Sequence, residues 1–150
     1  EPMVLFVVVK LKQIFKQQRD YPWPRPASCP RCREGRVWGH GFVMAYFDEY
    51  PHGLFLRRFR CPGCGCVIRL RPKGYFEHFQ ASIQRIYGSL RQRIVSGRYD
   101  LGLSRSRQRH WMCALRRQVA AALGEGFRFR LLEGFCALVK AGRVPIATRI

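Results

Sequence analysis

The sequence predicts an α+β fold in which a small three-stranded β unit is followed by a basic three-helix bundle. Two Cys-x-x-Cys pairs flank a stretch that is rich in β-branched and aromatic residues, which favours strands. After Tyr75 the apolar residues change to a spacing of three and four, which is typical of helices. A chain of 150 residues has room for one ordinary domain or two small modules.

The first 28 residues divide into an apolar segment and a linker. In residues 1–19, Val7, Leu11 and Phe15 have helical spacing, whereas the run of three valines that starts at Val7 favours a strand. We therefore expect a helix or a strand here, and favour the helix. In residues 20–28, prolines at alternate positions end any helix and favour an extended linker.

Residues 29–74 are expected to form the β unit. Its strands are expected at residues 37–47, 54–60 and 66–71. Gly39 and Gly41 are expected to form bulges in the first strand. The turn-forming stretch at residues 48–53 separates the first two strands, so these two should pair as a hairpin.

Residues 75–150 are expected to form the basic helical region. The first helix is expected along an apolar stripe from Phe76 to Ile94. The second is expected to begin after Ser104, its N-cap, and to end at Gly124. The third is expected at residues 130–141, with Gly142 as its C-cap. Cys113 and Cys136 fall within these helices and are expected to be core thiols.

The composition is strongly basic, with 28 Lys and Arg residues against 9 Asp and Glu residues and a net charge of +19. Of the 28 bases, 23 are Arg, and the excess is spread along the whole chain. Because arginine binds phosphates and guanine edges through two nitrogens, nucleic acid is the first partner to consider. A genome whose codons favour Arg would give the same bias without any such partner.

Two classes of protein fit the sequence poorly. No apolar run approaches the ~20 residues that a membrane span needs, so no membrane partner is expected. The nine acidic residues are scattered, whereas a two-metal nuclease needs clustered carboxylates, so the protein is not expected to be an enzyme.

The strongest motif is a matched pair of turns, Cys29-Pro-Arg-Cys32 and Cys61-Pro-Gly-Cys64. Two such turns supply the four thiolates of a tetrahedral metal site, and a hairpin over the 28 intervening residues would bring them together. One zinc ion per chain is the favoured occupant, and a single iron is the alternative.

Other candidate metal ligands lie near these turns. Cys66 shares a strand face with Ile68 and Leu70, so it is expected to be a buried apolar residue, with service as a substitute ligand as the alternative. His40 and His52 lie on the hairpin and are expected to be surface residues, although they could approach the metal or a nucleic acid.

A second signal is the basic segment at residues 98–118. Arg105, Gln108 and Arg109 would occupy the exposed start of a helix, as in a helix-turn-helix reader of the major groove, while a solvated basic face is the alternative interpretation. The candidate nucleic-acid-binding residues of the whole chain are Arg57, Arg58, Arg69, Arg71, Arg98, Arg105, Arg107, Gln108, Arg109, Arg116 and Arg117.

The paired turns and the basic helix together resemble zinc-ribbon proteins, and zinc-ribbon plus helix-turn-helix DNA-binding domains associated with bacterial transposases and mobile elements. The resemblance covers residues 27–120, and its specific part is CPRC…RRFRCPGCGCVIRLRP. It implies a zinc ribbon at residues 29–74 and a helix-turn-helix-like bundle after it. It also implies a cytoplasmic, nucleoid-associated bacterial protein that binds duplex DNA beside a recombinase or transposase.

Two other functions remain open at this stage. A basic zinc ribbon with exposed aromatic residues such as Trp38, Phe42 and Tyr46 also suits RNA or a ribosome, because unpaired bases stack on such rings. The ribbon could instead serve a protein-interaction adaptor, in which the apolar run from Phe135 to Val139 mediates a dimer.

Overall fold

The computed structural model describes residues 2–149, which form two compact units that divide between Ala81 and Ser82. Within these residues, the first unit contains a β-sheet and one short α-helix, and the second contains three longer α-helices. The α+β class expected from the sequence is confirmed. In the described part of the chain, no helix is both long and apolar enough to cross a membrane.

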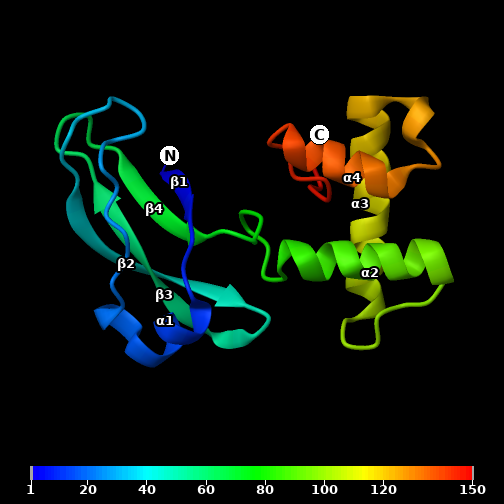
Figure 1. Ribbon diagram of the computed structural model, residues 1–150, viewed down its shortest axis with the longest axis horizontal. Coiled ribbons are helices and arrows are strands. Elements are labelled where there is room, and N and C mark those ends of the chain that lie inside the picture. Colours follow the sequence, from blue (N-terminus) through cyan, green and yellow to red (C-terminus); the bar gives the residue numbers. More distant parts are fainter. Residues whose placement is uncertain (1, 150) are drawn as a thin grey trace. The chain divides into compact units, whose positions relative to one another are not determined.

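The sheet of the first unit has four strands where three were expected (Figure 1). The strands are β1 (Met3–Val7), β2 (Trp38–Phe47), β3 (Tyr50–Arg60) and β4 (Val67–Pro72), and they lie in the order β1-β4-β3-β2. β1 pairs in parallel with β4, whereas the other two pairs are antiparallel.

The extra strand comes from the N-terminal segment, for which a helix was favoured. Met3 to Val7 adds to the free edge of β4, because that edge offers unpaired backbone groups and the segment is rich in β-branched residues. A helix does follow, as α1 (Leu11–Gln17), and it continues into the 3₁₀ turn η1 (Gln18–Asp20). Both alternatives for this segment are therefore present, one after the other.

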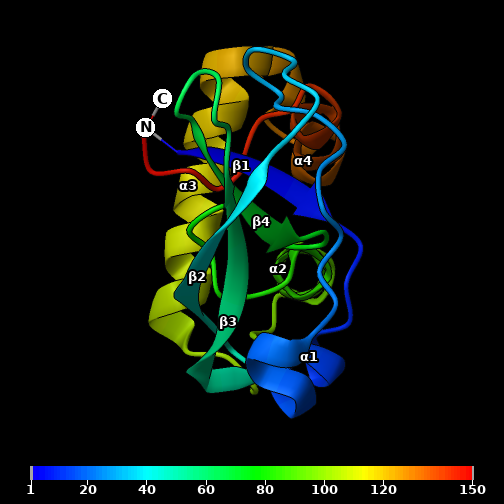
Figure 2. The same cartoon turned by 90° about the vertical axis from the view of Figure 1, so that its left-hand side faces the viewer.

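The β2–β3 hairpin agrees with the expected strands in most of its length. The pairing shifts by one residue between Gly39 and Phe42, and Gly41 has a φ of 72°, so the expected bulge is present. The turn is tighter than residues 48–53, because Phe47 pairs with Tyr50. The ring of Tyr50 lies 5.4 Å from that of Phe15, which places α1 beside the turn (Figure 2).

The core of the first unit consists of two clusters. One, at the cysteine end of the hairpin, contains the buried residues Cys29, Val37, Phe59, Cys61, Cys66, Ile68 and Leu70. The other, near the hairpin turn, contains Ile14, Phe47, Leu54, Leu56 and Tyr75. The first cysteine of each turn, Cys29 or Cys61, is therefore part of a hydrophobic core, whereas Cys32 and Cys64 are exposed.

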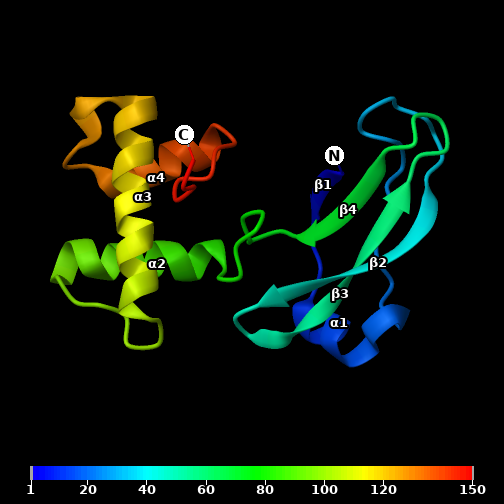
Figure 3. The same ribbon diagram turned by 180° about the vertical axis from the view of Figure 1, so that it is seen from behind.

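The second unit contains α2 (Ile83–Ser96), α3 (Arg105–Leu123), the 3₁₀ turn η2 (Glu125–Phe127) and α4 (Leu131–Lys140). α3 is the central helix and crosses both α2 and α4 (Figure 3). Its expected boundaries are confirmed, because the Ser104 hydroxyl accepts a hydrogen bond from the Arg107 N–H and the helix ends before Gly124.

α2 begins later than the apolar stripe predicted, at an N-cap formed by Ser82. Phe76 and Phe79 lie outside the helix because the Arg71 guanidinium donates hydrogen bonds to both of their carbonyl oxygens, at 3.1 and 2.7 Å. These side-chain bonds hold the segment in an irregular conformation that its apolar periodicity did not reveal.

Candidate metal centre and basic surface

The four predicted thiols come together in one cluster at the end of the hairpin farthest from its turn. Their Sγ atoms all lie within 4.8 Å of one another, with Cys29 and Cys64 3.7 Å apart and Cys32 and Cys61 3.4 Å apart. A tetrahedron with metal–sulfur bonds of about 2.3 Å has sulfur–sulfur edges of about 3.8 Å. The cluster can therefore hold one metal ion with little movement.

The two cysteine turns have the same backbone design. The N–H of Arg33 donates to the Cys29 carbonyl oxygen at 2.8 Å, and the N–H of Gly65 donates to that of Cys61 at 2.9 Å. Both donors have a left-handed backbone, with φ of 64° for Arg33 and 74° for Gly65. Glycine adopts this conformation without strain, so the second turn has the residue that the geometry favours.

Backbone N–H groups also prepare the sulfurs for a cation. The N–H of Cys32 is the main group that lowers the pKa of Cys29 to about 6, and the N–H of Arg31 lies 3.4 Å from the Cys29 Sγ. The N–H of Glu34 acts in the same direction on Cys32, but the nearby Cys61 thiol and burial outweigh it and raise the pKa of Cys32 to about 12. A metal ion that binds here must therefore displace protons.

Cys66 lies outside this cluster of four. Its side chain is buried in the adjacent core and its thiol donates to the Val67 carbonyl oxygen at 3.6 Å, as expected for a small apolar residue. Cys113 and Cys136 differ from the expectation that they are core thiols, because both are exposed on their helices. His40 is half-buried and His52 is exposed, and neither belongs to the cluster.

The candidate arginines of the sheet have different environments. Arg71 is bound to two carbonyl oxygens and its guanidinium lies over the Phe47 ring, so burial lowers its pKa and it holds the fold together. Arg58 and Arg69 are half-buried neighbours on β3 and β4. Arg57 lies over the rings of Phe42 and Phe59. The sheet therefore presents fewer free guanidinium groups than its sequence suggested.

Gln108 is the clearest correction among the candidates of α3. Its side chain is 4% exposed, and its amide bonds to the backbone N–H of Asp100 and to the carbonyl oxygens of Asp100 and Leu103. All of these groups belong to the connector between α2 and α3, so Gln108 fixes that connector and has no group left to read a base.

The remaining candidates lie on different sides of the second unit. Arg98, Arg105, Arg109, Arg116 and Arg117 are exposed, while Arg107 is half-buried with its guanidinium over the Trp111 ring. Arg105 and Arg109 also lie over the Tyr99 ring, together with Arg93, which sequence reasoning did not select. Arg109 donates to the Tyr99 hydroxyl at 3.3 Å and thereby lowers the pKa of that tyrosine.

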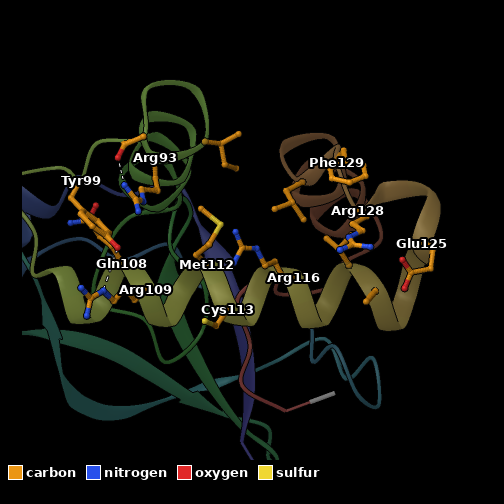
Figure 4. A pocket seen from close by; sticks show the side chains of 16 residues that line it. Arg93, Tyr99, Gln108, Arg109, Met112, Cys113, Arg116, Glu125, Arg128 and Phe129 are labelled. Carbon is orange, nitrogen blue, oxygen red and sulfur yellow. Dashed lines mark hydrogen bonds between the residues drawn. The ribbon is translucent and has the colours of Figure 1, made fainter.

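A cleft of about 1050 Å³ runs along α3 and includes Arg93, Tyr99 and Arg109 of this cluster, but not Arg105, at one end (Figure 4). We call it the helical cleft; its charged and aromatic lining residues are Arg93, Tyr99, Arg109, Arg116, Glu125, Arg128 and Phe129. The sequence selected only Arg109 and Arg116 from this set. Arg128 and Phe129 come from the segment after α3, which carried no motif.

Comparisons with protein-family models, with curated proteins and with solved structures found no match to this chain.

Proposed function

We propose that the protein is a zinc-dependent nucleic-acid-binding protein and that duplex DNA is its favoured partner. The cysteine cluster supports a structural role for the metal. Four thiolates complete a tetrahedral shell, whereas catalytic zinc sites keep one position open for water or substrate. Cys29 and Cys61 are fully buried within a hydrophobic cluster, so the ion would connect the two turns to the core and stabilise the sheet.

The observation that carries the nucleic-acid proposal is the group of three guanidinium groups around Tyr99. Among residues 2–149, no carboxylate forms a salt bridge with Arg93, Arg105 or Arg109. The nearby carboxylate of Asp100 is paired with Arg85 at 3.2 Å. Three guanidinium groups held close together without an acidic partner are a natural site for phosphates.

α3 gives this surface a geometry suited to a duplex. Arg105 and Arg109 are exposed one turn apart at its N-terminal end, where a helix can enter the major groove. The resemblance to helix-turn-helix domains of mobile elements fits this arrangement, although residues 97–104 form a longer connector than a tight turn. A cytoplasmic, nucleoid-associated protein that acts with a recombinase or transposase is the context we propose.

RNA is the second candidate partner, because of a separate observation on β2. The side chains of Trp38 and Tyr46 are 62% and 51% exposed, and exposed rings on a strand are suited to stacking with unpaired bases. This alternative would place the interface on the sheet of the first unit and leave α3 with a lesser role.

The test compares Arg105→Ala and Arg109→Ala with the unchanged protein on a selected duplex site and on scrambled DNA. With six to eight phosphate contacts, log K should fall with log salt at a slope of about −5 to −7. Each substitution should weaken binding to the selected site by about 1–3 kcal/mol and affect scrambled DNA little. Equal losses on both duplexes would show that these residues only neutralise charge, and stronger binding to structured RNA would favour the alternative.

A further inference from the structure

The helical cleft has a lining that a duplex-binding surface does not require. Between its arginines, its floor is apolar and includes Met112, Val119 and Leu131. Phe129 lines the cleft with 91% of its side chain exposed, and the Arg128 guanidinium lies 5.4 Å from its ring centroid. The cleft therefore offers both cationic groups and uncovered apolar surface to a ligand.

The dimensions of the cleft match an unpaired strand better than a duplex. Pockets for small ligands have volumes of about 300–1,000 Å³, and the helical cleft, at about 1050 Å³, is only slightly larger. The major groove of a duplex is about 12 Å wide and admits an α-helix. In that binding mode the protein helix enters the DNA groove, and the duplex does not enter a cleft of the protein. An unpaired strand, in contrast, can place individual bases within a space of this size.

The charges are arranged along the length of the cleft. Arg109 and Arg116 are seven residues apart on α3, which corresponds to about 10 Å along the helix axis. Arg93 lies at one end and Arg128 at the other, and Glu125 is the acidic residue of the described lining. A strand that follows α3 would thus have its backbone beside guanidinium groups over the whole cleft.

We infer that the helical cleft binds an unpaired stretch of nucleic acid, with its phosphates on Arg109 and Arg116 and a base stacked on Phe129. The inference rests on the proposed function, since it assigns an unpaired form of nucleic acid to a site that shares Arg109 with the N-terminal end of α3 but does not include Arg105. Aromatic rings combined with a basic groove are the usual means by which proteins hold single strands without sequence preference.

Two exposed cysteines of the second unit provide the test. Cys113 lines the helical cleft, whereas Cys136 is exposed on α4 and is not part of its lining. The rate of alkylation by iodoacetamide is measured at each cysteine by peptide mass spectrometry. The rate is measured for the protein without ligand and for the protein saturated with one of three probes. The probes are a short oligothymidylate, a duplex of the same length and thymidine monophosphate. The oligothymidylate should slow alkylation of Cys113 severalfold and leave Cys136 unchanged.

Matched variants test the individual contacts. Phe129→Ala should weaken oligothymidylate binding by about 5- to 100-fold, whereas Leu101→Ala, which removes another highly exposed apolar side chain outside the cleft, should have no effect. Arg116→Gln should weaken it more than Arg117→Gln, because both arginines are exposed on α3 but only Arg116 lines the cleft.

Three results would overturn the inference. Equal protection of Cys113 by the duplex would make the cleft part of the duplex surface, and equal protection by the mononucleotide would make it a site for free nucleotides. If none of the three probes changed the rate at which iodoacetamide alkylates Cys113, the cleft would have no nucleic-acid ligand. In this last case, duplex binding that persists and is sensitive to Arg105→Ala would retain the proposed function, whereas absence of all nucleic-acid binding would reject both.

Discussion

Gln108 illustrates how a single polar residue in a basic helix serves the fold. Its amide accepts from the Asp100 N–H at 2.9 Å and donates to the Asp100 carbonyl oxygen at 2.8 Å, so it acts as a backbone-like partner for the connector. Asp100 in turn pairs with Arg85 on α2. This chain of contacts sets the path of the connector and so the position of Tyr99, around which the arginines gather.

We therefore expect Gln108→Ala to lower the free energy of unfolding by about 1–3 kcal/mol, because buried backbone groups would lose their partners. The measurement is chemical denaturation followed by the helical circular dichroism signal. Gln84→Ala, at an exposed position of α2, is the control and should change stability by less than about 0.5 kcal/mol. Equally small effects of the two substitutions would contradict the structural role of Gln108.

The packing of α4 against α3 depends on a glycine. A Cβ atom added at Gly134 would lie 2.8 Å from one methyl carbon of Val119 and 3.3 Å from the other. Real Cβ atoms essentially never approach another atom within 3.0 Å, so the two helices are as close as a glycine allows. α4 also contributes the buried side chains of Phe135 and Leu138 to the core of the second unit.

Two glycine substitutions in helices of this unit should therefore have opposite effects. Gly134→Ala should destabilise the protein by about 1–3 kcal/mol, because the added methyl group forces the helices apart. Gly88→Ala should stabilise it by about 0.5–1 kcal/mol, because that position of α2 is exposed and has open space. Thermal unfolding of both variants gives the comparison, and a stabilising Gly134→Ala would show that α3 and α4 are less tightly packed.

The whole molecule consists of two units, and the cysteine cluster belongs entirely to the first. That unit divides its buried residues between two clusters, of which one includes two of the thiols. Small cores of this kind bury limited apolar surface, so a metal that joins the two cysteine turns contributes directly to folding. The helices of the second unit have their own buried core and do not include any of the four thiols.

Loss of the metal should consequently affect one unit and spare the other. Cys61→Ser should reduce bound zinc from about one ion per chain to almost none, and should remove hydrogen-exchange protection around residues 29–37 and 59–70. Protection of α2, α3 and α4 should persist. Elemental analysis and hydrogen exchange measure the two effects.

Cys66→Ser is the matched control for this experiment, since Cys66 is buried beside the cluster without belonging to it. It should retain zinc. If Cys66→Ser abolished metal binding and Cys64→Ser did not, the assigned set of ligands would be wrong.

The sequence by itself determined the features that depend on local chemistry. The spacing within each Cys-x-x-Cys turn positions two thiols through a few backbone bonds, and a hairpin between the turns is the simplest way to join them. Ser104 and Gly124 mark the ends of α3 because a helix cap involves neighbouring residues alone. These elements could be predicted without knowledge of any distant contact.

Tertiary structure decided the features that depend on contacts from outside the segment concerned. Met3 to Val7 became a strand because β4 offered a free edge, and the segment before α2 stayed irregular because Arg71 holds its carbonyl groups. The helical cleft combines residues of all three helices with Arg128 and Phe129, whose segment has no motif. Periodicity and composition describe one segment at a time. They give the number of arginines and their positions in the chain, but not which arginines share a surface.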